Sequence, residues 1–190
     1  MSYVAESFDE EVVRLLKQGG VGFMPSDTIY GLSGRALDKQ PVNKLHALKD
    51  RQTHKPFIIL ISDLKMLDLL SIAREEVRAV KKYWPGPVTL ICLAPSSPAW
   101  LHQGLGTLAV RMPANQNLLN LINQVGPLIS TSANLHGQSP ASDMAKAQAI
   151  FGDKLDFYVD MGEIDGPPST IVKLDNGKLQ VVRSGAARIS

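Results

Sequence analysis

Short apolar runs of strand length recur along the chain, and they limit its possible folds more than any other feature. They cover residues 21–24, 57–61, 88–93, 107–112 and 128–131. The run at 57–61 is apolar at every position, which is typical of a central strand buried on both faces. Further strands are expected at 157–161 and 170–174, and Asp175-Asn176-Gly177 predicts a hairpin turn into a last strand at 179–183.

Helical periodicity fills the intervals between these runs. Ser7-Phe8-Asp9-Glu10 predicts a capping box that opens a first helix, which Gly19-Gly20 ends. Further helices are expected at residues 41–48, 64–70, 75–84, 118–125 and 144–151, the last capped by Ser142 or Asp143, whereas residues 26–34 are rich in turn formers. This alternation predicts an α/β fold around one mixed sheet, and the lack of a linker or repeat predicts a single domain over residues 1–190.

The composition indicates the cellular compartment of the protein more clearly than its function. The formal charge of the 190 residues is +2, which does not mark a nucleic-acid binder, although a local basic surface stays open. The single cysteine, Cys92, excludes an internal disulfide and is expected to be a small buried hydrophobe in a reducing compartment. No apolar run reaches bilayer-spanning length, and the acidic N-terminus lacks a signal pattern. We therefore expect a cytoplasmic protein without a membrane contact.

Several signatures of catalysis are missing from the sequence. It contains no P-loop, no Gly-x-Gly-x-x-Gly that opens a helix after a strand, and no serine in a nucleophile elbow. The four histidines are scattered without metal-ligand spacing, so we expect no metal site built from protein ligands.

Polar residues instead follow the apolar strands, where open α/β sheets bind ligands. Ser26-Asp27-Thr28 follow the run at 21–24, Arg111 lies near the end of 107–112, and Thr131-Ser132-Ala133-Asn134 close the run at 128–131. A guanidinium inside a sheet needs an anion, which is either a ligand carboxylate or phosphate or a structural partner such as Asp27. The hydroxyl and amide side chains at 131–134 serve equally well as turn formers or as ligand contacts.

A cationic stretch, Lys49-Asp50-Arg51-Gln52-Thr53-His54-Lys55-Pro56, precedes the strand at 57–61. Lys49, Arg51 and Lys55 would face one way in an extended chain, and Pro56 disfavours a helical Lys55. We therefore expect a helix that opens into a loop and directs three cations at one anion. The alternative is a solvated basic loop.

Taken together, these blocks resemble the YrdC-like family. The resemblance rests on Pro25-Ser26-Asp27-Thr28-Ile29-Tyr30-Gly31-Leu32, Lys49-x-Arg51-x-x-x-Lys55-Pro56, Pro85-Gly86-Pro87-Val88-Thr89, Val110-Arg111-Met112-Pro113, Ser130-Thr131-Ser132-Ala133-Asn134, Pro168-Ser169-Thr170-Ile171-Val172 and Arg183-x-Gly185. It covers essentially the whole chain and implies the short, single-domain form of the family, a twisted mixed sheet with flanking helices and a large, positively lined concave cavity.

The best-known members of this family are threonylcarbamoyl-AMP synthases, so the resemblance implies a nucleotidyltransferase that joins L-threonine, bicarbonate and ATP and releases pyrophosphate. Separate partner proteins would then transfer the threonylcarbamoyl group to ANN-decoding tRNAs. By resemblance, ATP turnover rests on Lys49, Arg51, Ser132 and Asn134, threonine binding on Thr28, Arg111, Thr131 and Ser169, and further nucleotide contacts on Lys55, Thr107 and Arg183. Mg²⁺ is expected to accompany ATP, held mostly by phosphates and water.

Three departures from the family pattern are His136, where a serine is usual, Ala187, where an isoleucine is common, and Ser26 for a frequent threonine. The first two bear on loop geometry and the third keeps the hydroxyl. Our mechanistic hypothesis is that Lys49 and Arg51 neutralise the triphosphate, while Arg111 fixes the amino acid's carboxylate and Thr28 its polar end. The alternatives are a module that binds RNA directly, in double-stranded or ribosomal form, and an inactive paralogue of the same fold.

Overall fold

The computed structural model describes residues 1–49 and 57–190. Its helical segments are α1 (Glu10–Lys17), α2 (Lys39–Leu48), α3 (Met66–Leu69), α4 (Ala99–His102), α5 (Gln116–Val125), α6 (Met144–Phe151) and the 3₁₀ helices η1 (Arg74–Tyr83) and η2 (Gly152–Lys154). Its strands are β1 (Tyr3–Ala5), β2 (Gly22–Met24), β3 (Gly31–Arg35), β4 (Ile58–Leu60), β5 (Val88–Leu93), β6 (Thr107–Arg111), β7 (Leu128–Ser132), β8 (Phe157–Val159), β9 (Thr170–Asp175) and β10 (Lys178–Arg183).

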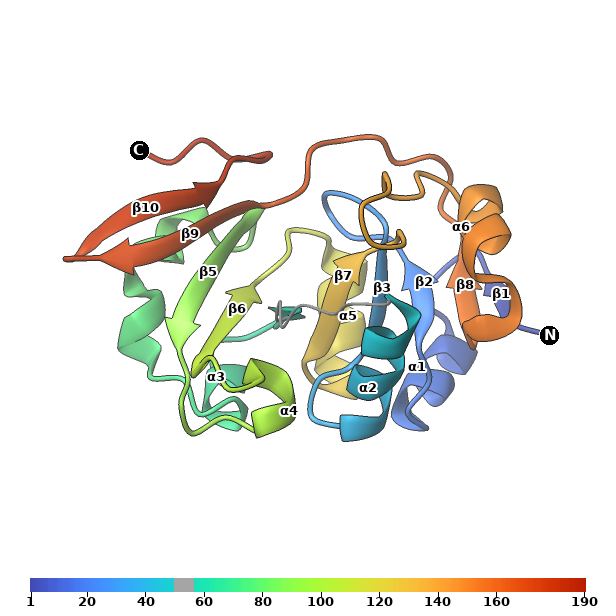
Figure 1. Cartoon of the computed structure of the whole chain (residues 1–190), viewed down its shortest axis with the longest axis horizontal. Helices are drawn as coiled ribbons and strands as arrows, with labels where there is room; N and C mark the ends of the chain where they lie inside the picture. The colour runs from blue at the N-terminus through green and yellow to red at the C-terminus, as the bar shows by residue number, and fades with distance from the viewer. Residues whose placement is uncertain (50–56) are drawn as a thin grey trace.

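Within the described chain, these strands form one mixed sheet in the order β1-β8-β2-β3-β7-β4-β6-β5-β9-β10. Figure 1 shows β1 and β8 at one end of the molecule and the β9–β10 hairpin at the other. The segment between β8 and β9 runs across the top from one end to the other. The sequence prediction of a single-domain α/β fold with a mixed sheet is confirmed.

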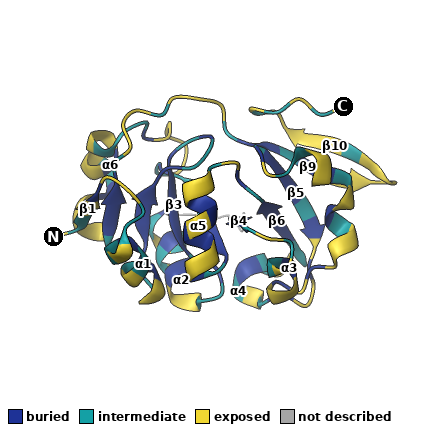
Figure 2. Ribbon diagram, turned by 180° about the vertical axis from the view of Figure 1, so that it is seen from behind, coloured by how far each residue is buried: buried dark blue, intermediate teal, exposed yellow. Residues whose placement is uncertain are grey.

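Helices cover both faces of the sheet. α5 lies behind the sheet in Figure 1 and in front of it in Figure 2, whereas α2 lies in front in Figure 1. Val12 and Leu16 of α1 pack with Leu118, Ile122 and other residues of α5 in one apolar cluster. The other face is covered by a second cluster that includes Val42 and Leu45 of α2.

Most predicted elements are present with shifted ends, and β5 and α6 have the predicted bounds. The capping box at Ser7 is wrong. Asp9 has extended backbone angles and caps α1, its Oδ1 accepting from the Val12 amide at 2.9 Å. Asp143 caps α6 in the same way. The hairpin turn is confirmed by positive φ angles at Asn176 and Gly177, 48° and 76°.

The turn-rich interpretation of residues 26–34 is wrong at its end, because β3 begins at Gly31 and lies between β2 and β7 in the sheet. The two glycines of this strand look like turn signals in sequence. Gly34 is needed for packing instead, since a Cβ there would lie 2.8 Å from the Cβ of Pro41 at the start of α2. The strand β1 and the short helix α4 had no sequence signal that we identified.

Candidate active site

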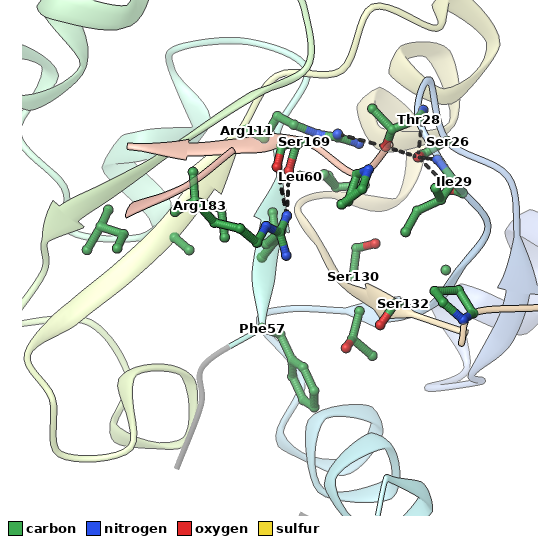
Figure 3. A pocket seen from close by; sticks show the side chains of 18 of the residues that line it. Ser26, Thr28, Ile29, Phe57, Leu60, Arg111, Ser130, Ser132, Ser169 and Arg183 are labelled. Atoms are coloured by element: carbon green, nitrogen blue, oxygen red, sulfur yellow. Dashed lines mark hydrogen bonds between the residues drawn. The ribbon is translucent and has the colours of Figure 1, made fainter. Parts of the chain in front are cut away.

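A cavity of about 630 Å³ opens above the middle of the sheet. Its walls come from β3, β4, β5, β6, β7, β9 and β10, together with residues 26–30 and the segment before β9. Figure 3 shows Arg111, Arg183, Ser169, Thr28 and Ser132 around it. Among the lining residues within the described ranges, Arg111 and Arg183 are the charged ones, so the lining is positive.

The structure brings most of the predicted site residues to this cavity. Those that line it are Thr28, Thr107, Arg111, Thr131, Ser132, Ser169 and Arg183. Lys49 and Asn134 lie behind Ser132 and contact it. Arg51 and Lys55 lie outside the described residues.

Arg111 is the most deeply buried charge on the cavity wall, with 3% of its surface exposed. Its Nη2 lies 2.9 Å from Asp27 Oδ1, and its Nη1 donates to Thr28 Oγ1 at 3.0 Å. Its Nε is buried and makes no hydrogen bond within residues 1–49 and 57–190. Burial lowers the pKa of Arg111, and Asp27 partly offsets this. The structural partner is therefore present, yet the guanidinium keeps bonding capacity for a second anion.

Thr28 is oriented by its neighbours. The Ser26 hydroxyl donates to the Ile29 carbonyl at 2.7 Å, and the Ser26 and Thr28 hydroxyl oxygens are 3.0 Å apart. The Ser26 oxygen also accepts from the Thr28 and Ile29 amides, at 3.2 and 3.3 Å, so both of its lone pairs are engaged. Thr28 Oγ1 accepts from Arg111, and this contact holds the hydroxyl at the cavity wall.

Lys49 serves a closed network rather than the open cavity. It has 1% of its surface exposed, and its ammonium donates to Ser132 O at 2.7 Å, Asn134 O at 2.7 Å and Asn134 Oδ1 at 2.5 Å. The Ser132 hydroxyl also donates to Asn134 Oδ1, at 2.7 Å. Lys49 follows α2 with helical backbone angles, so the predicted helix end is confirmed but Lys49 itself is not extended. This network fixes the end of β7, where Ser132 faces the cavity.

Arg183 reaches the cavity because β10 contains a bulge. Val181 pairs with Val172, but Arg183, two residues later, pairs with Ile171, which leaves Val182 as an extra residue. In a regular ladder Arg183 would lie opposite Thr170, on the core face of the sheet. The bulge turns it to the face of Ile171, and Arg183 Nη2 donates to Ser169 O at 2.7 Å. Arg183 is an exposed residue, and partial desolvation of its guanidinium lowers its pKa.

The expectation that these groups meet at the carboxyl ends of strands needs correction. β2 and β7 both run antiparallel to β3, whereas β6 is parallel to β4, which runs antiparallel to β7. Arg111 therefore lies at the end of β6, a strand that runs in the opposite direction to β2 and β7. It meets the others because the loop after β2 places Asp27 and Thr28 against its guanidinium.

One polar contact of the site was missed from the sequence. Thr89, which the sequence prediction placed in the strand at 88–93 without a role at the site, is fully buried, and its Oγ1 lies 2.8 Å from Ser169 Oγ. The alternation of β5 places Thr89 on the face of Ile91, a lining residue. This alternation is the sequence signal by which Thr89 could have been assigned to the site.

Comparison with known proteins identifies the family of this chain. The model of the Sua5/YciO/YrdC family, described as "Telomere recombination", matches residues 14–185. The chain belongs to this family. A family relative from Pyrococcus abyssi (strain GE5 / Orsay), named threonylcarbamoyl-AMP synthase, is 34% identical over 194 residues, which cover 96% of this chain and 56% of that protein. A putative threonylcarbamoyl-AMP synthase from Mycobacterium tuberculosis (strain CDC 1551 / Oshkosh) is 33% identical over 180 residues, 91% of this chain and 82% of its own.

Solved structures of the Sua5/YciO/YrdC family have the same fold. P. abyssi Sua5 complexed with L-threonine superposes with a TM-score of 0.85 at 30% identity, over 97% of this chain and 57% of that one. Escherichia coli YciO superposes with the same TM-score at 24% identity, over 99% and 98% of the two chains, which supports the fold alone. This chain thus spans little more than half the length of the P. abyssi protein.

Two features are absent from the described residues. No helix there combines the length and apolar character required to cross a bilayer. No group of His, Cys, Asp and Glu there has the arrangement of a metal site.

Proposed function

We propose that this protein is a threonylcarbamoyl-AMP synthase, a nucleotidyltransferase that converts L-threonine, bicarbonate and ATP to threonylcarbamoyl-AMP and pyrophosphate. The observation that carries the proposal is Arg111, a buried guanidinium on the cavity wall with five N–H donors, more than its contacts with Asp27 and Thr28 use. The names of the relatives and the threonine complex of P. abyssi Sua5 supply the substrate class.

In this proposal the two ends of the cavity bind different substrates. Arg111 binds the carboxylate of threonine, because a guanidinium and a carboxylate form parallel hydrogen bonds. Thr28, Thr131 and Ser169 hold the remainder of the amino acid. The nucleotide is held by Ser132, Thr107 and Arg183, with Lys49 and Asn134 supporting Ser132, and by Arg51 and Lys55 from outside the described residues.

The chemistry requires positioning rather than a protein nucleophile. The threonine amine and bicarbonate form a carbamate with loss of water, and a carbamate oxygen then attacks the α-phosphorus of ATP as pyrophosphate leaves. Holding reactants in line lowers a barrier by about 7–11 kcal/mol in favourable cases. Fixed cations stabilise the charge that develops on the leaving pyrophosphate. The cavity's hydroxyls and guanidiniums suit both tasks.

Mg²⁺ enters this proposal as part of the nucleotide substrate. Within the described residues no carboxylate lines the cavity, and Asp27, which contacts the lining residue Arg111, is paired with it. The described residues therefore fit a Mg²⁺ held by phosphates and water rather than by a protein cage. The product would pass to separate proteins that modify tRNA, in the cytoplasm.

The test is pyrophosphate release measured with and without threonine and bicarbonate. We expect release only when both are present, and we expect Arg51→Ala to abolish it while the thermal unfolding midpoint stays unchanged. Steeply salt-dependent RNA binding without ATP consumption would favour the RNA-binding alternative. Neither activity would indicate an inactive paralogue, and full activity of Arg51→Ala would remove the cationic stretch from the mechanism.

A further inference from the structure

Thr89 and Ser169 form a hydroxyl pair at the cavity wall. Thr89 lies on β5 opposite Ile171 and has no exposed surface, whereas Ser169 precedes β9 and lines the cavity. Their hydroxyl oxygens are 2.8 Å apart, so one of them donates to the other. Which one donates decides what Ser169 can offer a ligand.

The direction of this bond follows from the surroundings of Thr89. Within the described chain its hydroxyl makes this one side-chain hydrogen bond. If Ser169 donated, the fully buried hydroxyl proton of Thr89 would lack an acceptor, which is costly. Thr89 is therefore the donor and Ser169 Oγ the acceptor.

A second donor occupies the other side of Ser169. Arg183 Nη2 lies 2.7 Å from Ser169 O and 3.5 Å from Ser169 Oγ, and a guanidinium can only donate. A serine hydroxyl has two lone pairs and one proton. Ser169 Oγ thus faces two donors, Thr89 at 2.8 Å and Arg183 at a longer 3.5 Å, so its own proton is left for an acceptor in the cavity.

The backbone around Ser169 is also fixed. The amide of Thr170 donates to Pro87 O at 2.9 Å, and the amide of Ala186 donates to Pro168 O at 2.8 Å. A Cβ at Gly185 would lie 2.2 Å from Pro168 O, so the chain after β10 packs directly against this segment. The rotation of the hydroxyl is the remaining freedom of Ser169, and Thr89 restricts it.

We propose that Thr89 is a positioning residue that makes Ser169 a permanent hydrogen-bond donor to an acceptor oxygen of the amino-acid substrate. This rests on the proposed function. Ser169 offers its proton to an oxygen of the substrate. A substrate that presented an N–H or O–H group to Ser169 would meet a mismatched hydrogen bond.

The test compares Thr89→Val, which keeps the shape and removes the hydroxyl, with Thr89→Ser, which keeps the hydroxyl. We expect Thr89→Val to raise KM for threonine about 10-fold, with kcat and KM for ATP within about 2-fold of wild type. Thr89→Ser should stay within about 2-fold in all three constants. The double variant Thr89→Val/Ser169→Ala should be no worse than Ser169→Ala alone, because the two hydroxyls act together.

Thr170→Val is the matched control. Thr170 is as buried as Thr89, but its hydroxyl donates to Ala187 O at 2.6 Å on the core face. The Thr170→Val variant should have a lower thermal unfolding midpoint and an unchanged KM for threonine.

An unchanged KM for threonine in Thr89→Val would overturn the role of Thr89 but not the proposed function. Equal impairment of Thr89→Val and Thr89→Ser would do the same. A wild-type protein without threonine-dependent pyrophosphate release overturns the proposed function and this inference with it.

Discussion

Lys49 and Arg111 are both almost fully buried cations, one behind the cavity wall and one on it, yet their hydrogen bonding differs. Lys49 places its ammonium against three oxygens of Ser132 and Asn134. Arg111 is bound at its Nη atoms by Asp27 and Thr28, while its Nε makes no hydrogen bond in the part of the chain described. One cation is satisfied by the protein, and the other is satisfied only in part.

This difference separates two roles of a buried charge, which can hold the local structure in place or bind a ligand. A satisfied cation holds its own surroundings in place, and in the proposed function Lys49 supports ATP turnover by positioning the end of β7. A partly satisfied cation stores bonding capacity for a ligand, at the cost of desolvation. Burial alone does not distinguish the two, whereas the count of hydrogen-bond donors does.

The largest effect is expected from Lys49→Met, which removes the cation whose hydrogen bonds are satisfied by the protein. Loss of the ammonium leaves its carbonyl acceptors unpaired, so we expect the free energy of unfolding to fall by about 3 kcal/mol and pyrophosphate release to be lost. Urea unfolding and the enzyme assay measure the two effects. Lys17→Met, at an exposed lysine of α1, is the control and should change neither. A Lys49→Met protein of native stability would show that its hydrogen bonds contribute nothing.

Arg111→Lys tests the cation that the protein satisfies only in part. An ammonium can replace the ion pair with Asp27 but cannot offer the planar fork of a guanidinium. KM for threonine should rise about 10- to 100-fold, while the free energy of unfolding changes by about 1 kcal/mol or less. Steady-state kinetics and urea unfolding measure these quantities. An unchanged KM for threonine would place the carboxylate elsewhere.

Arg183→Gln extends the comparison to a cation without a carboxylate contact in the described chain. Arg183 is an exposed residue, and desolvation lowers the pKa of its guanidinium without an offsetting carboxylate. We expect kcat/KM to fall about 10-fold, with an unfolding midpoint close to that of wild type. A lower midpoint together with unchanged kcat/KM would mean that Arg183 is structural.

The sequence predicted the outline of the fold well, because apolar runs such as 88–93 and turn pairs such as Asn176-Gly177 act locally. It failed where tertiary packing decides. Gly31 and Gly34 look like turn residues, yet both lie in a central strand, where a Cβ at Gly34 would come within 2.8 Å of Pro41 Cβ. The N-cap of α1 was misplaced by two residues because Ser7 and Asp9 are both good caps.

The candidate site was predictable as a set of residues but not as an arrangement. Motif order identified Thr28, Arg111, Ser132 and Ser169, all of which line one cavity. The direction of β6, the closed network around Lys49 and the contact between Thr89 and Ser169 depend on pairings distant in the chain. Residue type and local spacing do not encode such pairings.

The extra residue in β10 has a consequence for changes in chain length. Because Val182 lies between two fixed cross-strand pairs, removing it would yield a regular ladder with Arg183 still opposite Ile171. The hairpin can therefore shorten by one residue without moving its arginine. Lengthening it would require a second irregularity, so insertions and deletions in this strand should differ in their tolerance.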